Sequence, residues 1–211
     1  AGAVIEQAKS FVLPIKTYQY LESDPLSGLT NALTKLESHE SASVQVLIRP
    51  TNERWRQHTH IASQDVMNNR THLVSRGPLG RTVGLLMSGQ TNPDQKEKIH
   101  LSRQQEEMLQ ALQEKGSKVG FETMIRIIAT GASQDRADNT LKILIAAFSQ
   151  FHAPQFNSFK YRSVPSTRIG RDYLLRLFGN APKMILNAEE LSSIYHLPTK
   201  LIETPGVKWQ M

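Results

Sequence analysis

The sequence contains no cysteine, and this absence excludes several kinds of chemistry at once. A chain without cysteine forms no disulfide, carries no thiolate nucleophile and offers no cysteine ligand for zinc. Long apolar runs are lacking as well, since none approaches the roughly 20 residues that a membrane-spanning helix requires. The first residues, AGAVIEQAKSFVLP, lack the basic stretch and apolar core of a signal peptide. Methionine does not begin the chain, and we therefore expect it to be a segment of a longer protein.

What the sequence does contain is typical of a folded, positively charged protein. Hydrophobic residues make up 39% of the 211 positions and charged residues 21%, which is the balance of a globular domain and not of a disordered tail. Lysine and arginine together number 25 and aspartate and glutamate 19, so the formal net charge is +6. This excess favours anionic partners, either nucleic acid or a membrane surface, and it carries no information about the fold.

Residues 1–52 predict a strand, a helix and a second strand. The stretch FVLPIKTYQY (11–20) is rich in apolar and aromatic residues and is interpreted as a strand. A helix is expected over 23–38, because Asp24 can cap a first turn that begins with proline, and leucines then recur at helical spacing. The apolar stretch 42–50 predicts a short buried strand.

Residues 53–98 have a different texture, with few apolar positions and many Asn, Gln, Ser, Thr and Gly. A short helix is expected from Glu53 to about Gln64, and the remainder is interpreted as a long polar insertion or linker. Between Glu53 and Arg81, five arginines oppose two acidic residues, which gives a local charge balance of +3. These arginines are Arg54, Arg56, Arg70, Arg76 and Arg81.

Regular structure is expected again over 99–211. Ser102 and Gln105 have the spacing of a capping box, which predicts a helix that ends near Gly116. The alternating stretch GFETMIRIIAT (120–130) predicts a strand. Further along the chain, we expect a helix over 133–151, a strand over 155–164 and a helix over 166–179.

This order of elements predicts an α+β fold in which helices cover one face of a mainly antiparallel sheet. The simplest arrangement is a ferredoxin-like core, β-α-β followed by α-β-α-β, which the long polar insertion splits. The chain then divides into 1–52 as the first part of the core, 53–98 as the insertion, and 99–211 as the second part with C-terminal helices. The residues expected to share the core are Leu33, Leu36, Val46, Ile48, Ile125, Ile127, Leu144 and Phe148.

The stretch ILNAEELSSIYHLPTK (185–200) gathers an amide, two carboxylates, a tyrosine and a histidine, as a catalytic cluster would. Asn187 stands three residues before Glu190, so their side chains can satisfy free backbone N–H groups at the start of a helix. Pro198 ends the segment. The pattern therefore predicts a capped helix, with His196 as a turn residue or a partly buried residue and not as a catalyst.

Two other stretches have a limited likeness to known sites. GPLGRT (77–82) is too short for a nucleotide-binding loop and has arginine where that loop has lysine. His58 and His60 are either two solvated side chains or the metal-binding pair of a relaxase-like nuclease, a metal-dependent enzyme that nicks single-stranded DNA. Such a pair lies on a central strand, and Thr59 between the two histidines is polar. Other metal-ligand spacings and nucleophile turns are missing, so we expect no cofactor, no metal and no small-molecule substrate.

The arginines of the insertion and Trp55 form a candidate nucleic-acid-binding site. In this interpretation Arg54, Arg56, Arg70, Arg76 and Arg81 contact backbone phosphates, and the indole of Trp55 stacks on a base. The alternative is a solvated insertion in which Trp55 packs against the domain. Both interpretations fit the local balance of +3, and the sequence alone does not separate them.

Four segments of the chain are distinctive when they are taken together: DPLSGLTNALTKLESHESASVQVLIRPTNERWR, EKGSKVGFETMIRIIATG, LIAAFSQFHAPQFNSFK and ILNAEELSSIYHLPTKLIETPGVKW. They resemble the amino-terminal region of bacterial conjugative-transfer ATPases, which belong to the type IV secretion and coupling-protein class. The resemblance covers about 24–56 and 115–209. Its most specific parts are the Asp-Pro-Leu-x-Gly helix start and the Glu-Glu-Leu-x-x-x-Tyr-His-Leu-Pro segment.

The resemblance implies a non-catalytic accessory or assembly domain, because neither specific part is a catalytic signature and the motor's Walker A and Walker B segments are missing here. In the family, the Tyr-His-Leu-Pro and Thr-Pro-x-x-x-Trp segments lie just ahead of the motor. The implied partners are therefore the parent ATPase motor, neighbouring subunits of the secretion complex, and DNA. The implied location is the cytoplasm, at the inner membrane in the parent protein. The stretch 57–98 aligns least with the family.

Overall fold

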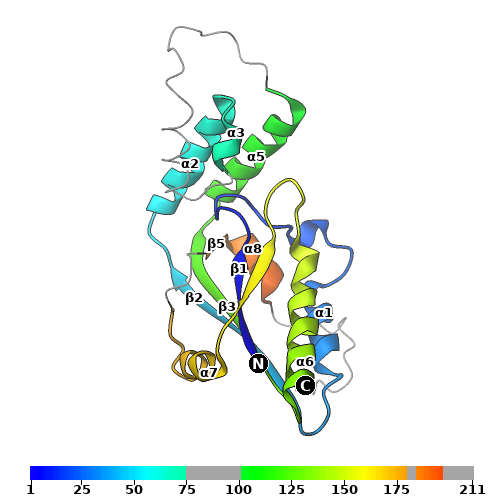
Figure 1. Ribbon diagram of the computed structural model, residues 1–211. Coiled ribbons are helices and arrows are strands. Elements are labelled where there is room, and N and C mark those ends of the chain that lie inside the picture. Colours follow the sequence, from blue (N-terminus) through cyan, green and yellow to red (C-terminus); the bar gives the residue numbers. More distant parts are fainter. Residues whose placement is uncertain (75–100, 180–183, 197–211) are drawn as a thin grey trace, which may run out of the picture.

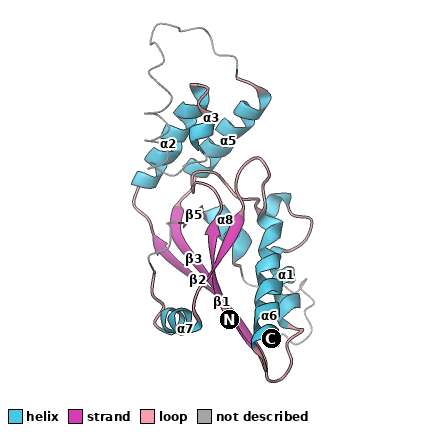
Figure 2. Cartoon of the chain, viewed as in Figure 1, coloured by secondary structure: helices cyan, strands magenta, loops and turns pink. Residues whose placement is uncertain are grey.

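The computed structural model describes residues 1–74, 101–179 and 184–196, and Figure 1 shows their arrangement. A sheet stands at the centre, helices flank it, and a second group of helices projects beyond one end (Figure 2). The helices and strands are, in chain order, β1 (Gly2–Gln7), α1 (Pro25–Leu33), β2 (Ser41–Pro50), α2 (Arg54–Met67), α3 (Thr71–Val74), α5 (Arg103–Ser117), β3 (Gly120–Thr130), α6 (Gln134–Ala147), β4 (Phe159–Ser163), α7 (Ser166–Leu174), β5 (Met184–Asn187) and α8 (Ala188–Ile194). Within these residues, no helix is both long and apolar enough to cross a membrane.

The strand pairs of the sheet are antiparallel, and the strand order is β2-β3-β1-β4. β5 pairs with residues 120–123 of β3, on the side where β1 pairs at 125–128, because β2 occupies the other side of β3. The connections β1-α1-β2 and β3-α6-β4 give this order the topology of a ferredoxin-like core. The predicted α+β fold, a ferredoxin-like core that is interrupted between β2 and β3, is therefore confirmed.

The first strand lies earlier in the chain than the sequence predicted. All six residues of β1 are buried, because the strand lies between β3 and β4 and is covered on both faces. A strand buried on both faces lacks the alternation of polar and apolar residues by which strands are recognised. The strand predicted at 11–20 is wrong, since this stretch is a connection with a short 3-10 turn at Tyr18–Tyr20. Its Val12 and Leu13 are buried against the projecting helices.

The main hydrophobic core lies between the sheet and α1, α6 and α8. The predicted core residues in this cluster are Ile125, Ile127, Leu144 and Phe148, with Leu33 and Val46 at its margin. Ile48 was also expected there, but it is 42% exposed because β2 is an edge strand. Leu36 lies outside the cluster, because α1 ends at Leu33 and not at residue 38 as predicted.

α7 packs against the opposite face of the sheet. Side chains alternate along β3, so Arg126 points away from the core that holds its two neighbours. The Arg126 guanidinium is buried and donates hydrogen bonds to Oε1 of Gln45 (3.0 Å) and to the backbone carbonyls of Asp172 (3.1 Å) and Leu177. Since carbonyls at a helix C-terminus carry partial negative charge, a buried arginine holds the end of α7 to the sheet.

α2, α3 and α5 form a helical projection beyond the sheet (Figure 2). α2 starts inside the predicted insertion and continues to Met67, and α5 begins with the predicted capping box of Ser102 and Gln105. The projection is held together by a second cluster of buried residues, Val12, Leu13, Ala62, Val66, Val74 and Leu112. The rest of the predicted insertion, 75–98, lies outside the described residues. The division of the chain into 1–52, 53–98 and 99–211 stays a prediction. In the structure, α5 of the third part packs mainly on α2 of the second part.

Ile127 gives a direct test of the core. Ile127→Asp would bury an unpaired charge where the side chain is 0% exposed, and we expect a loss of several kcal/mol, on the order of the total stability. The matched control is Ile143→Asp, because Ile143 is 44% exposed and should change stability by less than about 0.5 kcal/mol. Thermal melting of both variants measures the difference. A wild-type melting temperature for Ile127→Asp would contradict this assignment of the core.

Candidate functional site

The structure describes only part of the predicted nucleic-acid-binding cluster. Arg54 and Arg56 lie in the first turn of α2, where Arg54 is exposed and Arg56 pairs with Glu53 at 2.6 Å. Arg70 lies in the turn between α2 and α3. Arg76 and Arg81 lie outside the described residues. Arg54 and Arg56 thus share one turn of α2, but residues two apart on a helix project about 200° apart, so the grouping of the five arginines stays a prediction.

Trp55 does not face solvent. Its indole is 3% exposed and packs against Gly120 at the start of β3, where a β-carbon would stand only 2.5 Å from the ring. Glycine at position 120 therefore admits the ring, since any side chain there would collide with it. The buried indole is not placed to stack on a base. It packs on the domain, which was the alternative interpretation.

His58 and His60 lie on α2 and not on a central strand. Residues two apart on a helix project about 200° apart around its axis, so the two imidazoles do not converge on one ion. Nδ1 of His58 lies 2.9 Å from the carbonyl oxygen of Arg54, and Nε2 of His60 lies 3.3 Å from Nε2 of Gln64. Across the described part of the chain, no group of three or more acidic or histidine side chains is placed to hold a metal.

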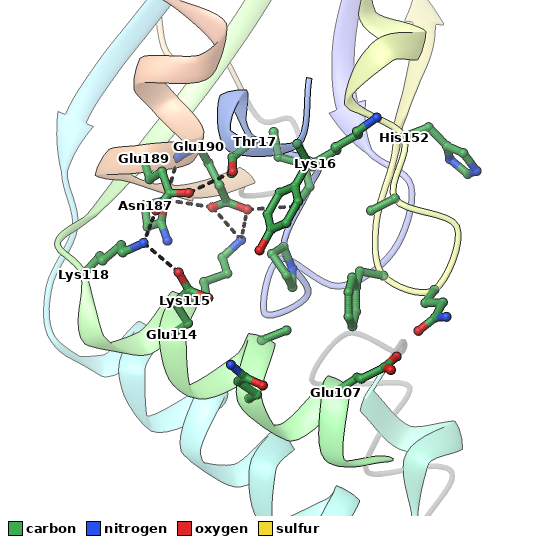
Figure 3. Close-up of a pocket in the computed structure, with 18 of the residues that line it drawn as sticks. Lys16, Thr17, Glu107, Glu114, Lys115, Lys118, His152, Asn187, Glu189 and Glu190 are labelled. Carbon is green, nitrogen blue, oxygen red and sulfur yellow. Dashed lines mark hydrogen bonds and ion pairs between the residues drawn. The ribbon is translucent and has the colours of Figure 1, made fainter. Parts of the chain in front are cut away.

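A concentration of buried charge lies instead beside a cavity of about 680 Å³. The cavity lies between α5, the start of α8, and the connections at 14–20 and 152–156. Figure 3 shows Lys115 of α5 and Glu190 of α8 pointing toward each other on one side of it. Lys16 and His152 lie on another side (Figure 3). We treat this junction between sheet and projection as the candidate site.

Glu190 is fully buried, and both of its carboxylate oxygens accept hydrogen bonds inside the protein. Oε1 accepts from the backbone N–H of Ile15 at 2.9 Å and from Nζ of Lys115 at 3.0 Å. Oε2 accepts from the backbone N–H of Asn187 at 2.8 Å and lies 2.9 Å from the same Nζ. Lys115 also donates to the carbonyl oxygen of Leu13 at 3.4 Å. One carboxylate thereby joins α5, α8 and the connection after β1.

The capping box predicted at Asn187 and Glu190 is present, and it is what orients Glu190. Oδ1 of Asn187 accepts from the backbone N–H of Glu190 at 2.8 Å, in exchange for the bond that Glu190 returns. The helix prediction is therefore confirmed, but the partner of the cap was missed. Lys115 stands three residues after Leu112 on the buried face of α5. A lysine on the apolar face of a helix was the available signal, because lysine is almost never fully buried unless it is paired.

His196 has the role of a partly buried residue that the sequence predicted. Its Nε2 lies 3.1 Å from Oδ1 of Asp24, and Nδ1 lies 3.1 Å from the carbonyl oxygen of Ser192. Asp24 also accepts a hydrogen bond from the backbone N–H of Leu26 at 2.8 Å, as the predicted N-cap of α1. The end of α8 is therefore tied to the start of α1.

A second, partly exposed ion pair lies beside the buried one. Lys118 donates to Glu189 and, at 3.1 Å, to Oε1 of Glu114, while Oγ1 of Thr17 donates to Oε1 of Glu189 at 2.8 Å. Burial acts to raise the pKa of Glu189, but the hydrogen bonds from Lys118 and Thr17 outweigh it and hold that pKa below its usual value. The hydrogen bond to Glu189 in turn raises the pKa of Lys118.

The protein encloses the buried pair, and this limits the chemistry that the pair can perform. Burial lowers the pKa of Lys115, against the opposing charge of Glu190, and a lysine with a lowered pKa beside a cavity can serve as a nucleophile or base. Here the Nζ of Lys115 is enclosed, and its hydrogen-bond acceptors are protein groups. The arrangement is therefore suited to fixing segments of the chain to one another.

Breaking the buried pair should be far more destabilising than breaking its partly exposed neighbour. Lys115→Met keeps much of the side-chain volume but leaves Glu190 charged without a counter-ion, and we expect a loss of about 3–5 kcal/mol in the free energy of unfolding. Lys118→Met is the matched control and should lose at most about 1 kcal/mol. Urea denaturation compares the two variants. Equal losses would show that the buried pair has no special weight.

The lowered pKa of Glu189 predicts a pH dependence of stability. Its folded-state pKa lies below the reference value of 4.5, so the unfolded state binds more protons as the pH falls. The stabilisation is complete above about pH 4.5 and is lost as the pH falls through the lower folded-state pKa. Glu189→Gln should therefore be less stable than wild type at about pH 6 and approach it in acid. Denaturation at several pH values measures this, and a constant difference would contradict it.

Comparison with known proteins identifies a family for this chain. No curated protein and no solved structure matches the sequence significantly. Residues 1–210 match the model of one family, and this range includes the sheet, the helical projection and the junction at Glu190. On the strength of that match, the chain belongs to the family described as Domain of unknown function (DUF8128).

Proposed function

We propose that this chain is a non-catalytic accessory and assembly domain of a conjugative-transfer or type IV secretion ATPase. The observation that carries the proposal is the contact between Asp24 and His196, at 3.1 Å. Asp24 begins the Asp-Pro-Leu-x-Gly segment and His196 belongs to the Tyr-His-Leu-Pro segment, the two most specific parts of the resemblance to such ATPases. These parts are 172 residues apart in the chain, and their contact supports a shared structural unit.

The elements that carry the resemblance support a scaffold role. The four similar segments cover α1 and β2, β3, the end of α6 with the start of β4, and β5 with α8, and they contribute much of the core. Within them, Asp24 and Asn187 cap helices and Glu190 closes the buried ion pair. At the junction around Glu190, the charged side chains that could take part in chemistry are instead bonded to one another.

The proposed partners are the parent motor domain and neighbouring subunits of the secretion or conjugation complex. In that setting the domain works in the cytoplasm, at the inner membrane, and it needs no cofactor and no small-molecule substrate. The closed ion pair at Glu190 suits such a role, because it fixes the helical projection to the core and so gives neighbouring subunits a defined surface.

DNA is the proposed further partner, contacted by the insertion through Arg54, Arg56, Arg70, Arg76 and Arg81. The local balance of +3 supports this contact, as does the exposure of Arg54 on α2. Trp55 has no part in it, because its indole is buried against Gly120. Binding would therefore rest on phosphate contacts and show little preference for sequence or for single strands.

Fluorescence anisotropy with labelled oligonucleotides at about 50 mM salt tests the DNA contact. We expect weak binding whose log–log salt dependence has a slope of about 0.7–0.9 per phosphate contacted. Replacing Arg54, Arg56, Arg70 and Arg76 by Gln should lower both the affinity and the slope and leave the melting temperature nearly unchanged. Gln at the exposed Lys35 and Lys142 is the control and should change neither. No measurable binding would remove DNA and leave the assembly role.

The rival function is a relaxase-like nuclease that uses His58 and His60. A cleavage assay on single-stranded DNA with Mn²⁺ separates the two proposals. Robust cleavage that His58→Ala abolishes would overturn the accessory role. The positions of the two histidines on α2 favour the absence of cleavage.

A further inference from the structure

The end of α7 carries an exposed group of leucines. Leu174, Leu175 and Leu177 are 78%, 62% and 41% exposed, and they lie within four consecutive residues. Single exposed leucines are common on protein surfaces, but three in one turn form a contiguous apolar surface. Ile169, on the other side of the helix, is buried against the sheet at Gly2, so α7 is already packed in the usual way. The exposed leucines are therefore not needed to pack α7 against the sheet.

The fold fixes the backbone that presents these leucines. The N–H of Leu177 donates to the carbonyl of Asp172 at 3.0 Å and that of Arg176 to the carbonyl of Tyr173 at 3.2 Å, which is a Schellman turn. Arg126 donates from beneath to the carbonyls of Asp172 and Leu177. Arg176 has a φ of 50°, a conformation that favours glycine. An arginine thus stands in a turn where glycine would be more stable.

The segment that carries the leucines is rich in cations. Residues 159–179 contain five cations, Lys160, Arg162, Arg168, Arg171 and Arg176, against the single acid Asp172. Arg162 pairs with Glu6 of β1 at 2.9 Å, so the balance of +4 within this segment becomes +3 when Glu6 is counted. Arg168 and Arg171 both face Asp172, whereas Arg176 is exposed and forms no ion pair within the described residues. Helical spacing places Arg171 on the same face as Leu174 and Leu175, three and four residues later, and places Arg168 on the same face as Leu175, seven residues later.

We propose that this surface docks on an anionic lipid bilayer. We define it as the α7 patch, which consists of Arg168, Arg171, Leu174, Leu175, Arg176 and Leu177. The leucines enter the interface between headgroups and acyl chains, and the arginines contact the anionic headgroups. The arginines favour a partner of negative charge. The leucines favour a bilayer over nucleic acid, because the phosphates of nucleic acid offer them no apolar contact. The inference is independent of the proposed ATPase context, because it uses other residues.

Flotation of the full chain with lipid vesicles tests the inference. We expect binding to phosphatidylcholine vesicles that contain about 30% phosphatidylglycerol, weakened by salt, and little binding to phosphatidylcholine alone. Leu174→Ser with Leu175→Ser should weaken binding on the order of tenfold, by the loss of apolar burial. Ile143→Ser is the control, because it removes an apolar side chain of α6 that is 44% exposed and lies outside the α7 patch, and it should leave binding unchanged.

Arg176→Gly separates binding from folding. Glycine suits the left-handed backbone at position 176, so the melting temperature should equal or exceed that of wild type. The loss of one cation near an anionic surface should nevertheless weaken vesicle binding about fivefold. A variant that is more stable and yet binds less well is a result that damage to the fold does not produce.

Several results would overturn the proposal. One is no binding to anionic vesicles at about 50 mM salt, and another is wild-type binding by the leucine double variant. DNA binding that depends on the α7 patch would assign the surface to nucleic acid, and patch-dependent self-association in sedimentation equilibrium would assign it to a second copy of the chain. The arginine variants of the insertion should bind vesicles as wild type does, so failure of the DNA contact and failure of membrane docking are distinguishable.

Discussion

A single buried carboxylate, that of Glu190, fixes the helical projection to the part of the chain that carries the sheet. Removing an ionised group from water is strongly unfavourable, and here the group is compensated by Lys115 and by two backbone N–H donors. These donors come from the connection after β1 and from the start of α8, while Lys115 comes from the projecting helix α5. The carboxylate is fully compensated only when all three segments are in place, so we expect the projection to be held firmly against the sheet.

The same principle operates on the opposite face of the sheet. Arg126 is buried there, and it holds the end of α7 by its backbone carbonyls, as Lys115 holds α5 through Glu190. Burial acts to lower the pKa of both cations, and in each case acceptor groups of the protein compensate the buried charge. The helical projection and α7 stand at different ends of the sheet (Figure 1). The domain thus presents two fixed surfaces, one proposed for assembly and DNA and the other for a bilayer, around a closed interior.

Local signals in the sequence were sufficient for much of the fold. The caps at Asp24, Ser102 and Asn187 identified three helix starts, because capping depends on residues within one turn. The strand β3 was recognisable from its alternation, and the topology followed from the order of elements. β1 was missed because both of its faces are buried, and β5 because a strand of four residues offers too little pattern.

The candidate site was less accessible to sequence reasoning, since it depends on long-range contacts. Asn187 and Glu190 were recognised as a cap, but the pairing of Glu190 with Lys115 joins residues 75 apart. Trp55 was placed on a helix in the right region, yet its burial depends on Gly120, which belongs to another element. Arginine content predicted anionic partners without indicating the surface, because the exposure of Leu174 and Leu175 is a property of the folded chain.

Native-state hydrogen exchange tests most directly whether Glu190 joins the segments into one unit. The backbone N–H groups of Ile15 and Asn187 donate to the same carboxylate, although Ile15 lies in an irregular connection and Asn187 at a helix start. If the junction opens only as a whole, both amides exchange with the same free energy, close to that of global unfolding. Exchange at Ile15 that is orders of magnitude faster than at Asn187 would contradict this account, because the connection would then open without the rest of the junction.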